Sequence, residues 1–173
     1  MIVSDASGLQ PAPWIVQWAG LVAPAASVLD LAAGRGRHSI FFAERGHKVT
    51  AVDRDVSTLL DHPNIERLQA DLEDGSPWPL PNRRFGAAVV TNYLHRPLMP
   101  QLLDAVAPGG VLLYQTFMVG NERFGKPSRP EFLLKDGELL ESVRGKFSVI
   151  AYEARLISEP AMAMVQRIAA RHV

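Results

Sequence analysis

The chain has 173 residues and no cysteine, and its 18 Lys and Arg residues balance 18 Asp and Glu residues to a formal net charge of zero. This length predicts one domain that can bury a hydrophobic core. The absence of cysteine excludes disulfide bonds, thiolate metal sites and a cysteine nucleophile. The neutral balance argues against binding to a long nucleic acid, which usually needs a basic surplus.

The N-terminal stretch, MIVSDASGLQ, has no basic segment and carries an early Asp5, so we expect no signal peptide. Residues 11–29 contain no charged side chain, a length that approaches a membrane span. Polar residues, glycine and proline interrupt this stretch, however, so we expect a buried helix followed by a separate strand. We therefore expect a cytoplasmic protein.

Apolar residues alternate between helical and strand periods along the chain. The helical pattern predicts helices at 11–23, 37–45, 56–60, 98–106 and 137–144. The strand pattern predicts strands at 27–32, 48–52, 65–70, 85–91, 111–118, 147–157 and 162–170. A loop at 72–84, a turn at 107–110 and a long connection at 119–135 complete the chain.

This order of elements predicts the fold class. Strands that alternate with helices form right-handed crossovers and a mostly parallel sheet, whereas the last two strands have no helix between them and must be antiparallel. We predict an α/β, doubly wound, mostly parallel seven-stranded sheet with one antiparallel edge strand and helices on both faces. One domain would span residues 1–173. Ligands of such sheets bind at the carboxyl ends of the strands.

The first predicted strand ends in VLDLAAGRGRHS, residues 28–39. Gly34 and Gly36 allow a tight turn and a close approach of the backbone to a ligand. Ser39 stands where a dinucleotide-binding motif has its third glycine, so the phosphate-binding motif is incomplete. A carboxylate at Asp30 would repel a phosphate but suits a ligand with an ammonium group.

Two further acidic residues follow strands. Asp53 closes the second strand, where a carboxylate can accept hydrogen bonds from both hydroxyls of a ribose, and Asp71 follows the third strand in QADLED, where it can address an adenine edge. S-adenosylmethionine combines a ribose, a flat base and a cationic group. Each acid also has a structural alternative, a loop-bracing carboxylate for Asp30 and a solvated turn residue for the other two.

VLDLAAGRGRHS, AVDRD at 51–55 and QADLED at 69–74 together resemble class I S-adenosylmethionine-dependent methyltransferases, which have a Rossmann-like fold. GRGRHSIFFAERGHKVTAVDRD and NERFGKPSRPEFLLKDGELL resemble, more narrowly, small bacterial proteins related to the tellurite-resistance methyltransferase. The resemblance implies S-adenosylmethionine as the cofactor, S-adenosylhomocysteine as the product and an in-line displacement. It implies cofactor-binding roles for Asp30, Ala33, Gly34, Gly36, His38, Asp53, Arg54, Asp71, Leu72 and Asn92. His38 can equally be structural, and the roles of Arg35 and Arg37 stay open.

The fourth strand ends in VVTNYLHRP, which in class I methyltransferases lines the side of the methyl acceptor. Tyr93 and His95 are the candidate catalytic residues, through polar contact or proton acceptance. His95 is equally well explained as a surface residue, and Tyr93 as a packing residue. The segment lacks the Asn/Asp-Pro-Pro-aromatic motif of base- and amide-methylating enzymes and the carboxylates of magnesium-dependent ones. We therefore predict no nucleic-acid target and no metal site.

The connection at 119–135 is too long for a plain loop in so short a chain. Basic and aromatic residues alternate in it, and Gly125 offers a hinge. We hypothesise a lid that closes over the acceptor pocket and excludes water, with residues 132–134 as its anchor; a packed surface loop is the alternative. The candidate substrate and lid residues are Arg96, Arg123, Phe124, Lys126 and Arg129.

The sequence thus predicts methyl transfer to a small molecule, either a metalloid oxyanion, a thiol or a small anionic compound. We expect no nucleic-acid or membrane partner, and a monomer or homodimer. One alternative is an NAD(P)-dependent oxidoreductase, which Asp53 would serve equally, but the chain lacks the third glycine, a Tyr-x-x-x-Lys pair and a second domain. The other is a non-catalytic module that binds S-adenosylmethionine.

Overall fold

The computed structural model describes residues 10–173, so most of the stretch tested for a signal peptide lies outside the described residues. One sheet contains β1 (Val28–Leu31), β2 (Val49–Asp53), β3 (Ile65–Gln69), β4 (Phe85–Thr91), β5 (Val106–Phe117), β6 (Phe147–Ile157) and β7 (Ala163–His172). The α-helices are α1 (Pro13–Trp18), α2 (Arg37–Ala43), α3 (Met99–Asp104) and α4 (Glu138–Val143). Short 3-10 turns follow α1 (Ala19–Leu21) and precede α3 (Arg96–Leu98).

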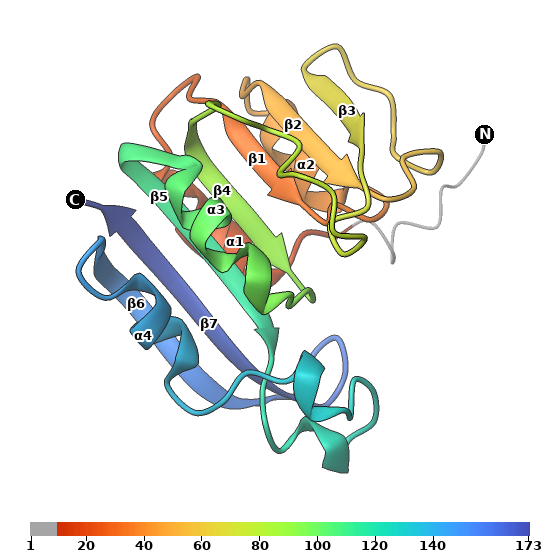
Figure 1. Cartoon of the computed structure of the whole chain (residues 1–173), viewed down its shortest axis with the longest axis vertical. Helices are drawn as coiled ribbons and strands as arrows, with labels where there is room; N and C mark the ends of the chain where they lie inside the picture. The colour runs from red at the N-terminus through yellow and green to blue at the C-terminus, as the bar shows by residue number, and fades with distance from the viewer. Residues whose placement is uncertain (1–9) are drawn as a thin grey trace.

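The strand order is β3-β2-β1-β4-β5-β7-β6 (Figure 1). The first five strands in this order are parallel, whereas β7 is antiparallel to both β5 and β6. This confirms the predicted fold class and places the reversed strand one position in from the edge. The chain order reverses between β1 and β4, so the carboxyl ends of these two strands flank the switch point of the sheet.

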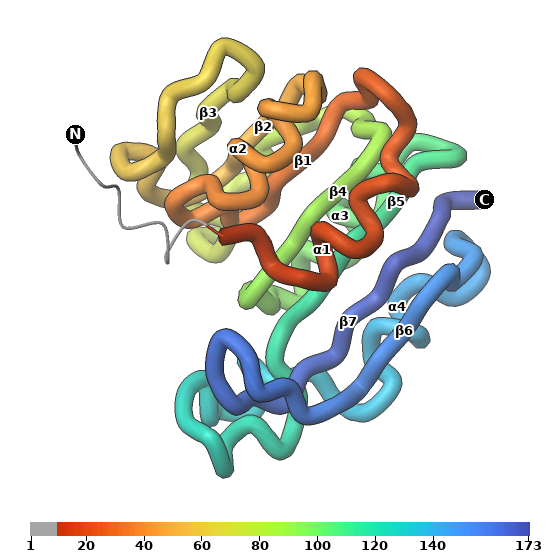
Figure 2. The backbone as a smooth tube through the Cα atoms, turned by 180° about the vertical axis from the view of Figure 1, so that it is seen from behind, coloured from red at the N-terminus to blue at the C-terminus, as the bar shows by residue number. Residues whose placement is uncertain are grey.

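Helices cover both faces of the sheet because successive side chains of each buried strand point to opposite sides. On one face, Ala88 and Val90 pack in a core with α3 and α4. On the other face, Ala87 and Val89 pack with α1 and α2. Figure 1 shows α3 and α4 in front of the sheet, and Figure 2, which views the molecule from the opposite side, shows α1 and α2 in front of it. Two apolar layers therefore enclose the sheet between the helices.

Two predicted elements differ in the structure. The helix predicted at 56–60 is wrong, because the Ser57 amide and hydroxyl both donate to the Asp55 carboxylate, at 2.9 and 2.6 Å, and form a turn there. The segment predicted as a turn at 107–110 lies within β5, where the pairing with β4 shifts register and Gly109 has a φ of 77°. Hydrogen bonds of the Asp55 side chain to Ser57 thus replace the predicted helix with a turn. At 107–110, a β-bulge lets the strand continue through the predicted turn.

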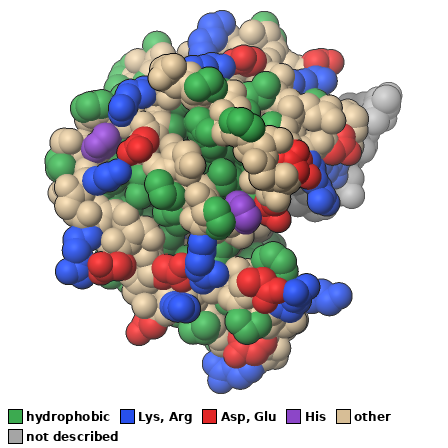
Figure 3. All heavy atoms as spheres, viewed as in Figure 1, with side chains coloured by type: hydrophobic (Ala, Val, Ile, Leu, Met, Phe, Trp, Pro, Cys, Tyr) green, Lys and Arg blue, Asp and Glu red, His purple; other side chains and the backbone are tan. Residues whose placement is uncertain are grey.

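In the described residues 10–173, no helix has the length and apolar character that crossing a membrane requires. Figure 3 shows Lys and Arg side chains interspersed with Asp and Glu over the face covered by α3 and α4. No large area of one sign is visible on this face.

The connection at 119–135 packs beyond the carboxyl end of β5 (Figure 1). Leu134 extends the sheet locally, since its amide donates to Phe117 O and its carbonyl accepts from the Val119 amide, both at 2.9 Å. The buried Asn121 side chain accepts from the Met164 amide at 3.0 Å and donates to Pro127 O at 2.9 Å. Leu134 is fully buried, so both ends of the connection are anchored.

Arg96 fastens the same connection from the other side. Its guanidinium pairs with both carboxylate oxygens of Glu138, at 2.6 and 2.9 Å. It also donates to the carbonyls of Glu131 and Leu133, at 3.0 and 2.8 Å. This bidentate, partly buried pair joins the segment after β4 to the start of α4.

We predict that Arg96→Ala lowers the free energy of unfolding by about 2 kcal/mol, because it removes charge-assisted hydrogen bonds and leaves Glu138 without its partner. Urea unfolding measures the change, and hydrogen exchange should speed up within 119–135. The matched control is Arg144→Ala, which breaks an exposed pair with Glu141 and should change stability by less than about 0.5 kcal/mol. Equal effects of the two substitutions on stability would contradict the conclusion that Arg96 fastens the connection at 119–135.

Candidate functional site

A hollow of about 450 Å³ opens at the carboxyl ends of β1, β2, β3 and β4. Such a volume lies within the range of small-molecule sites, about 300–1,000 Å³. It lies at the switch point predicted from the strand order. Its lining residues are Ala32, Asp53, Arg54, Ala70, Asp71, Leu72, Glu73, Asn92 and Tyr93.

The glycine loop after β1 is tied to the end of β2. The Gly34 amide donates to one oxygen of the Asp53 carboxylate at 2.8 Å, and the Asp55 amide donates to the other at 3.0 Å. Gly34 and Gly36 have φ values of 58° and 81°, which favour glycine. A Cβ on Gly36 would also collide with the Leu59 side chain. The loop therefore favours glycine at both positions, and Asp53 fixes its position beside the hollow.

Two residues with side chains also adopt left-handed conformations at the hollow. Ala32, directly after β1, has a φ of 56°, and Asn92, directly after β4, has a φ of 54°. A left-handed alanine costs about 1 kcal/mol, and such strain concentrates at functional sites. Since β1 and β4 are neighbours, both strained residues border the same opening.

Asp30 lies beneath the glycine loop and not in the wall of the hollow. Its side chain is 3% exposed and accepts a hydrogen bond from the Ser39 hydroxyl at 2.6 Å. Burial raises the pKa of Asp30 to about 6, although the hydrogen bond from Ser39 opposes the rise. Asp30 thus braces β1 against α2, and its cofactor-binding role stays a prediction.

His38 joins three elements. Its Nε2 accepts the Ala12 amide at 3.0 Å, so the ring proton lies on Nδ1, which faces the Thr91 hydroxyl at 3.4 Å. Burial, aided by the charge of Arg37, lowers the pKa of His38 to about 3. A neutral histidine therefore ties the leading segment to α2 and to the end of β4, and its predicted contact with the cofactor stays a prediction.

Tyr93 lines the hollow, whereas His95 does not. The Tyr93 hydroxyl is buried and has no partner within ordinary hydrogen-bond distance in residues 10–173, but the Glu73 carboxylate lies near it and competes for its proton. Burial, and secondly the charge of Glu73, raise the pKa of Tyr93. Its hydroxyl therefore stays protonated at neutral pH and is available as a hydrogen-bond donor. His95 is half-buried at the start of the 3-10 turn before α3.

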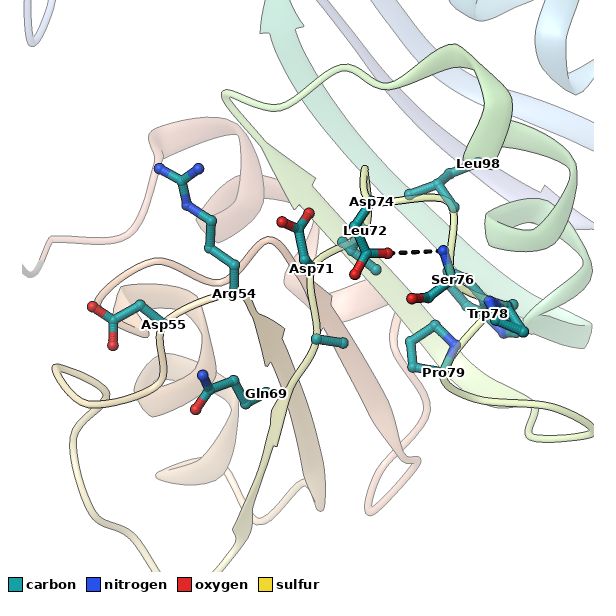
Figure 4. A pocket seen from close by; sticks show the side chains of 12 residues that line it. Arg54, Asp55, Gln69, Asp71, Leu72, Asp74, Ser76, Trp78, Pro79 and Leu98 are labelled. Carbon is teal, nitrogen blue, oxygen red and sulfur yellow. Dashed lines mark hydrogen bonds between the residues drawn. The ribbon is translucent and has the colours of Figure 1, made fainter.

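A second depression of about 690 Å³ adjoins the hollow and shares Arg54, Ala70, Asp71 and Leu72 with it. Figure 4 shows Arg54 and Asp71, which follow β2 and β3, on one side, and Trp78 and Pro79 on the loop beyond. The Asp74 carboxylate accepts the Ser76 amide at 2.8 Å and shapes that loop. Apolar and acidic groups thus lie together at the ends of β2 and β3, where the sequence predicted a base and a ribose.

Comparison with known proteins decides the family. The model of the tellurite resistance protein TehB family matches residues 14–152. This chain belongs to the TehB family. The narrower of the two resemblances drawn from the sequence is thereby confirmed. No curated protein sequence matches the chain significantly.

Solved structures agree on the fold. TehB from Haemophilus influenzae superposes with a TM-score of 0.76 at 18% identity, over 94% of this chain and 63% of that one. An S-adenosylmethionine-dependent methyltransferase from Mesorhizobium loti gives a TM-score of 0.72 at 17% identity, over 95% and 100%. Burkholderia thailandensis 1,6-didemethyltoxoflavin-N1-methyltransferase gives 0.65 at 22%, over 98% and 80%. The chain spans about 63% of the Haemophilus TehB chain.

The structure separates the predicted site residues of this TehB family member into three groups. The hollow brings together Asp53, Arg54, Asp71, Leu72, Asn92 and Tyr93. Asp30, Ala33, Gly34, Gly36 and His38 lie outside its wall and build the loop or the layer beneath it. The predicted lid residues line neither the hollow nor the adjoining depression: Arg96, Arg123, Phe124, Lys126 and Arg129. Within residues 10–173, no group of three His, Asp or Glu side chains could hold a metal ion.

Arg96, which precedes α3, is engaged in the pair with Glu138. The predicted basic lid residues of the connection at 119–135 are exposed. Arg129 pairs with Glu131. Arg123 lies over the Phe124 ring, 5.7 Å from its centroid. In this structure the exposed basic side chains therefore contact residues of the connection itself, and their predicted role in a lid stays a prediction.

Sequence reasoning missed a further hollow of about 420 Å³ on the other side of Asn92. The segment at 10–13, Arg37, Gln115 at the end of β5 and the turn between β6 and β7 form its walls. Gln115 was a detectable signal, because it is a polar residue within an otherwise apolar strand, VLLYQTF. The turn gave no signal, since only the fold brings it next to Arg37.

The shifted pKa values of Asp30 and His38 should make the stability of the protein depend on pH in two opposing ways. Asp30 ionises near its usual 3.8 in the unfolded chain but near 6 in the folded one, so its contribution to stability falls as pH rises between these values. His38 has the opposite sign, because only the unfolded chain binds its proton between about 3 and 6.5. Each pKa unit corresponds to about 1.4 kcal/mol, so the two slopes offset each other between about pH 4 and 6.

We predict that Asp30→Asn unmasks the His38 slope. Between pH 4 and pH 7, the free energy of unfolding of the variant should rise by about 3 kcal/mol relative to that of the parent chain, because the variant lacks the charge that burial penalises. Urea unfolding at several pH values measures this difference. Asp136→Asn, at an exposed acid, is the control and should follow the parent. Parallel curves for Asp30→Asn and the parent would show that Asp30 does not titrate as described.

Proposed function

We propose that this member of the TehB family is an S-adenosylmethionine-dependent methyltransferase that acts on a small molecule. The observation that carries the proposal is the Gly34–Asp53 hydrogen bond, which holds a glycine loop beside a carboxylate at the switch point. The Burkholderia relative is described with S-adenosylhomocysteine and the small molecule 1,6-didemethyltoxoflavin bound. The Mesorhizobium relative is described as S-adenosylmethionine-dependent. Both descriptions support the proposal.

The residues of the hollow fit S-adenosylmethionine. Asp53 already accepts two amides, but each carboxylate oxygen has a second lone pair, so both can still accept a ribose hydroxyl. Leu72 and the adjoining depression offer an apolar surface with Asp71 at its border, which suits an adenine. The Tyr93 hydroxyl, which has no partner within ordinary hydrogen-bond distance in residues 10–173, would donate to the ligand in competition with Glu73. The glycine loop would hold the methionine part.

When bound, S-adenosylmethionine supplies a methyl group on a positively charged sulfur, and its transfer leaves S-adenosylhomocysteine. The chain contributes mainly position to such a reaction. Asn92 borders both hollows and would lie where the cofactor and the acceptor meet. Tyr93 stays protonated and would orient a bound group without taking a proton. His95 lines neither hollow, so its catalytic role stays a prediction.

The finer parts of the proposal concern the surroundings. The acceptor would be a metalloid oxyanion, a thiol or a small anionic compound. Residues 1–173 would form one domain that works in the cytoplasm as a monomer or homodimer, without nucleic acid or membrane as a partner. The lid function of 119–135 stays a prediction. The NAD(P)-dependent oxidoreductase and the non-catalytic binding module are the alternatives, and the incomplete phosphate motif disfavours the first.

Calorimetric titration of the purified chain with S-adenosylmethionine, S-adenosylhomocysteine and NAD tests the cofactor. We expect both sulfur compounds to bind and NAD not to bind. Asp53→Ala should weaken the binding of S-adenosylmethionine by about 100-fold, since it removes about two charge-assisted hydrogen bonds. Asp136→Asn, at a residue that does not line the hollow, should leave this binding unchanged. Binding of NAD alone would support the oxidoreductase, and unchanged binding by Asp53→Ala would overturn the placement of the ribose.

A further inference from the structure

The hollow behind Asn92 has the features of a second binding site. It contains about 420 Å³ at the carboxyl ends of β4 and β5. Asn92 lines this hollow and the proposed cofactor hollow alike, so a ligand in one lies next to a ligand in the other. For convenience we call it the acceptor hollow.

Gln115 is an unsatisfied polar group in the wall of the acceptor hollow. Its side chain is 7% exposed, and its Oε1 makes no hydrogen bond within residues 10–173. An unpaired buried carbonyl costs about 1–3 kcal/mol, and native proteins rarely leave one. A ligand with an N–H or O–H group would satisfy it.

The charges of the wall are distributed unequally. Arg167 pairs with Glu153 at 2.6 Å and lies over the Trp14 ring, 4.8 Å from its centroid. Arg37 is half-buried and has no carboxylate within salt-bridge distance in residues 10–173, although the charge of the buried Asp30 acts on it from below. Among these residues, its guanidinium donates one long hydrogen bond of 3.4 Å, to Gln10 O. Arg37 is therefore the cation in this wall that an anionic ligand would meet.

The remaining wall is mainly apolar, with Pro13, Phe117 and Val165 among its residues. A small inorganic oxyanion would fill little of 420 Å³ and would lose hydration against such a wall. Glu159 lies at the rim in an exposed turn, where water screens its charge. The hollow thus suits an organic molecule that carries one negative charge.

We propose that the acceptor hollow binds the methyl acceptor and that this acceptor is a small organic acid with an N–H or O–H group. Its carboxylate pairs with Arg37, and its N–H or O–H donates to Gln115 Oε1. The inference rests on the proposed methyltransferase function and narrows it to an organic anion, in place of a metalloid oxyanion.

The test uses benzoate and its 2-, 3- and 4-amino derivatives, which share the carboxylate and differ in the position of an N–H donor. Ligand-observed NMR measures their dissociation constants with the full chain, alone and saturated with S-adenosylhomocysteine. At least one amino isomer should bind about fivefold more tightly than benzoate, as one hydrogen bond allows. Tellurite should not displace it.

Two substitutions separate the contacts. Gln115→Met should abolish the preference for the amino isomer, and Arg37→Gln should weaken all four acids by about tenfold. Gln101→Met and Arg123→Gln, at exposed positions outside the hollow, are the matched controls. If Gln115→Met fails to fold, Ala161→Trp fills the hollow from its exposed turn and should block all four acids.

Equal binding of benzoate and all amino isomers, an unchanged preference in Gln115→Met, or displacement by tellurite would overturn the inference. S-adenosylmethionine is titrated into each variant in parallel. If the parent chain does not bind S-adenosylmethionine, the proposed function is refuted. The binding of the aminobenzoates to the chain without cofactor then still tests the acceptor hollow. The two failures are thereby distinguishable.

Discussion

The hydrogen bond from the Gly34 amide to the Asp53 carboxylate joins the two loops on which the candidate site depends. Parallel pairing of Leu31 with Val52 brings the chain out of β1 beside the last residue of β2. One carboxylate therefore fixes the glycine loop and borders the hollow at the same time. Loop conformation and ligand binding are coupled through Asp53, so changes at this residue act on both.

Two buried ionisable groups lie under this loop, and their effects on stability have opposite signs. Burial keeps Asp30 protonated up to about pH 6, whereas His38 stays neutral down to about pH 3. Each has a short-range structural partner, Ser39 for the first and the Ala12 amide for the second. Both side chains therefore shape the layer beneath the glycine loop, and their predicted contact with the cofactor stays a prediction.

The parallel sheet could be predicted from the sequence because its strands are short apolar runs bounded by glycine, proline and acidic residues. β4 (Phe85–Thr91) coincides with its prediction. The failure at 56–60 came from a contest between helical periodicity and the side chain of Asp55, which bonds to Ser57 within the turn. Periodicity registers apolar spacing but not such local hydrogen bonds. Asp53 and Asp71 were placed at one edge correctly, because parallel strands must end together.

The acceptor side resisted prediction because its walls come from residues distant in sequence. Arg37 and Gln115 meet across one hollow only after β1, β4 and β5 have paired. The basic residues of 119–135 drew attention as a lid, yet Asn121 and Leu134 anchor both ends of that connection. Lid closure would have to move the exposed part between these anchors while they stay in place. The turn between β6 and β7, in contrast, already lines the hollow, so the wall of the acceptor side exists without any closure.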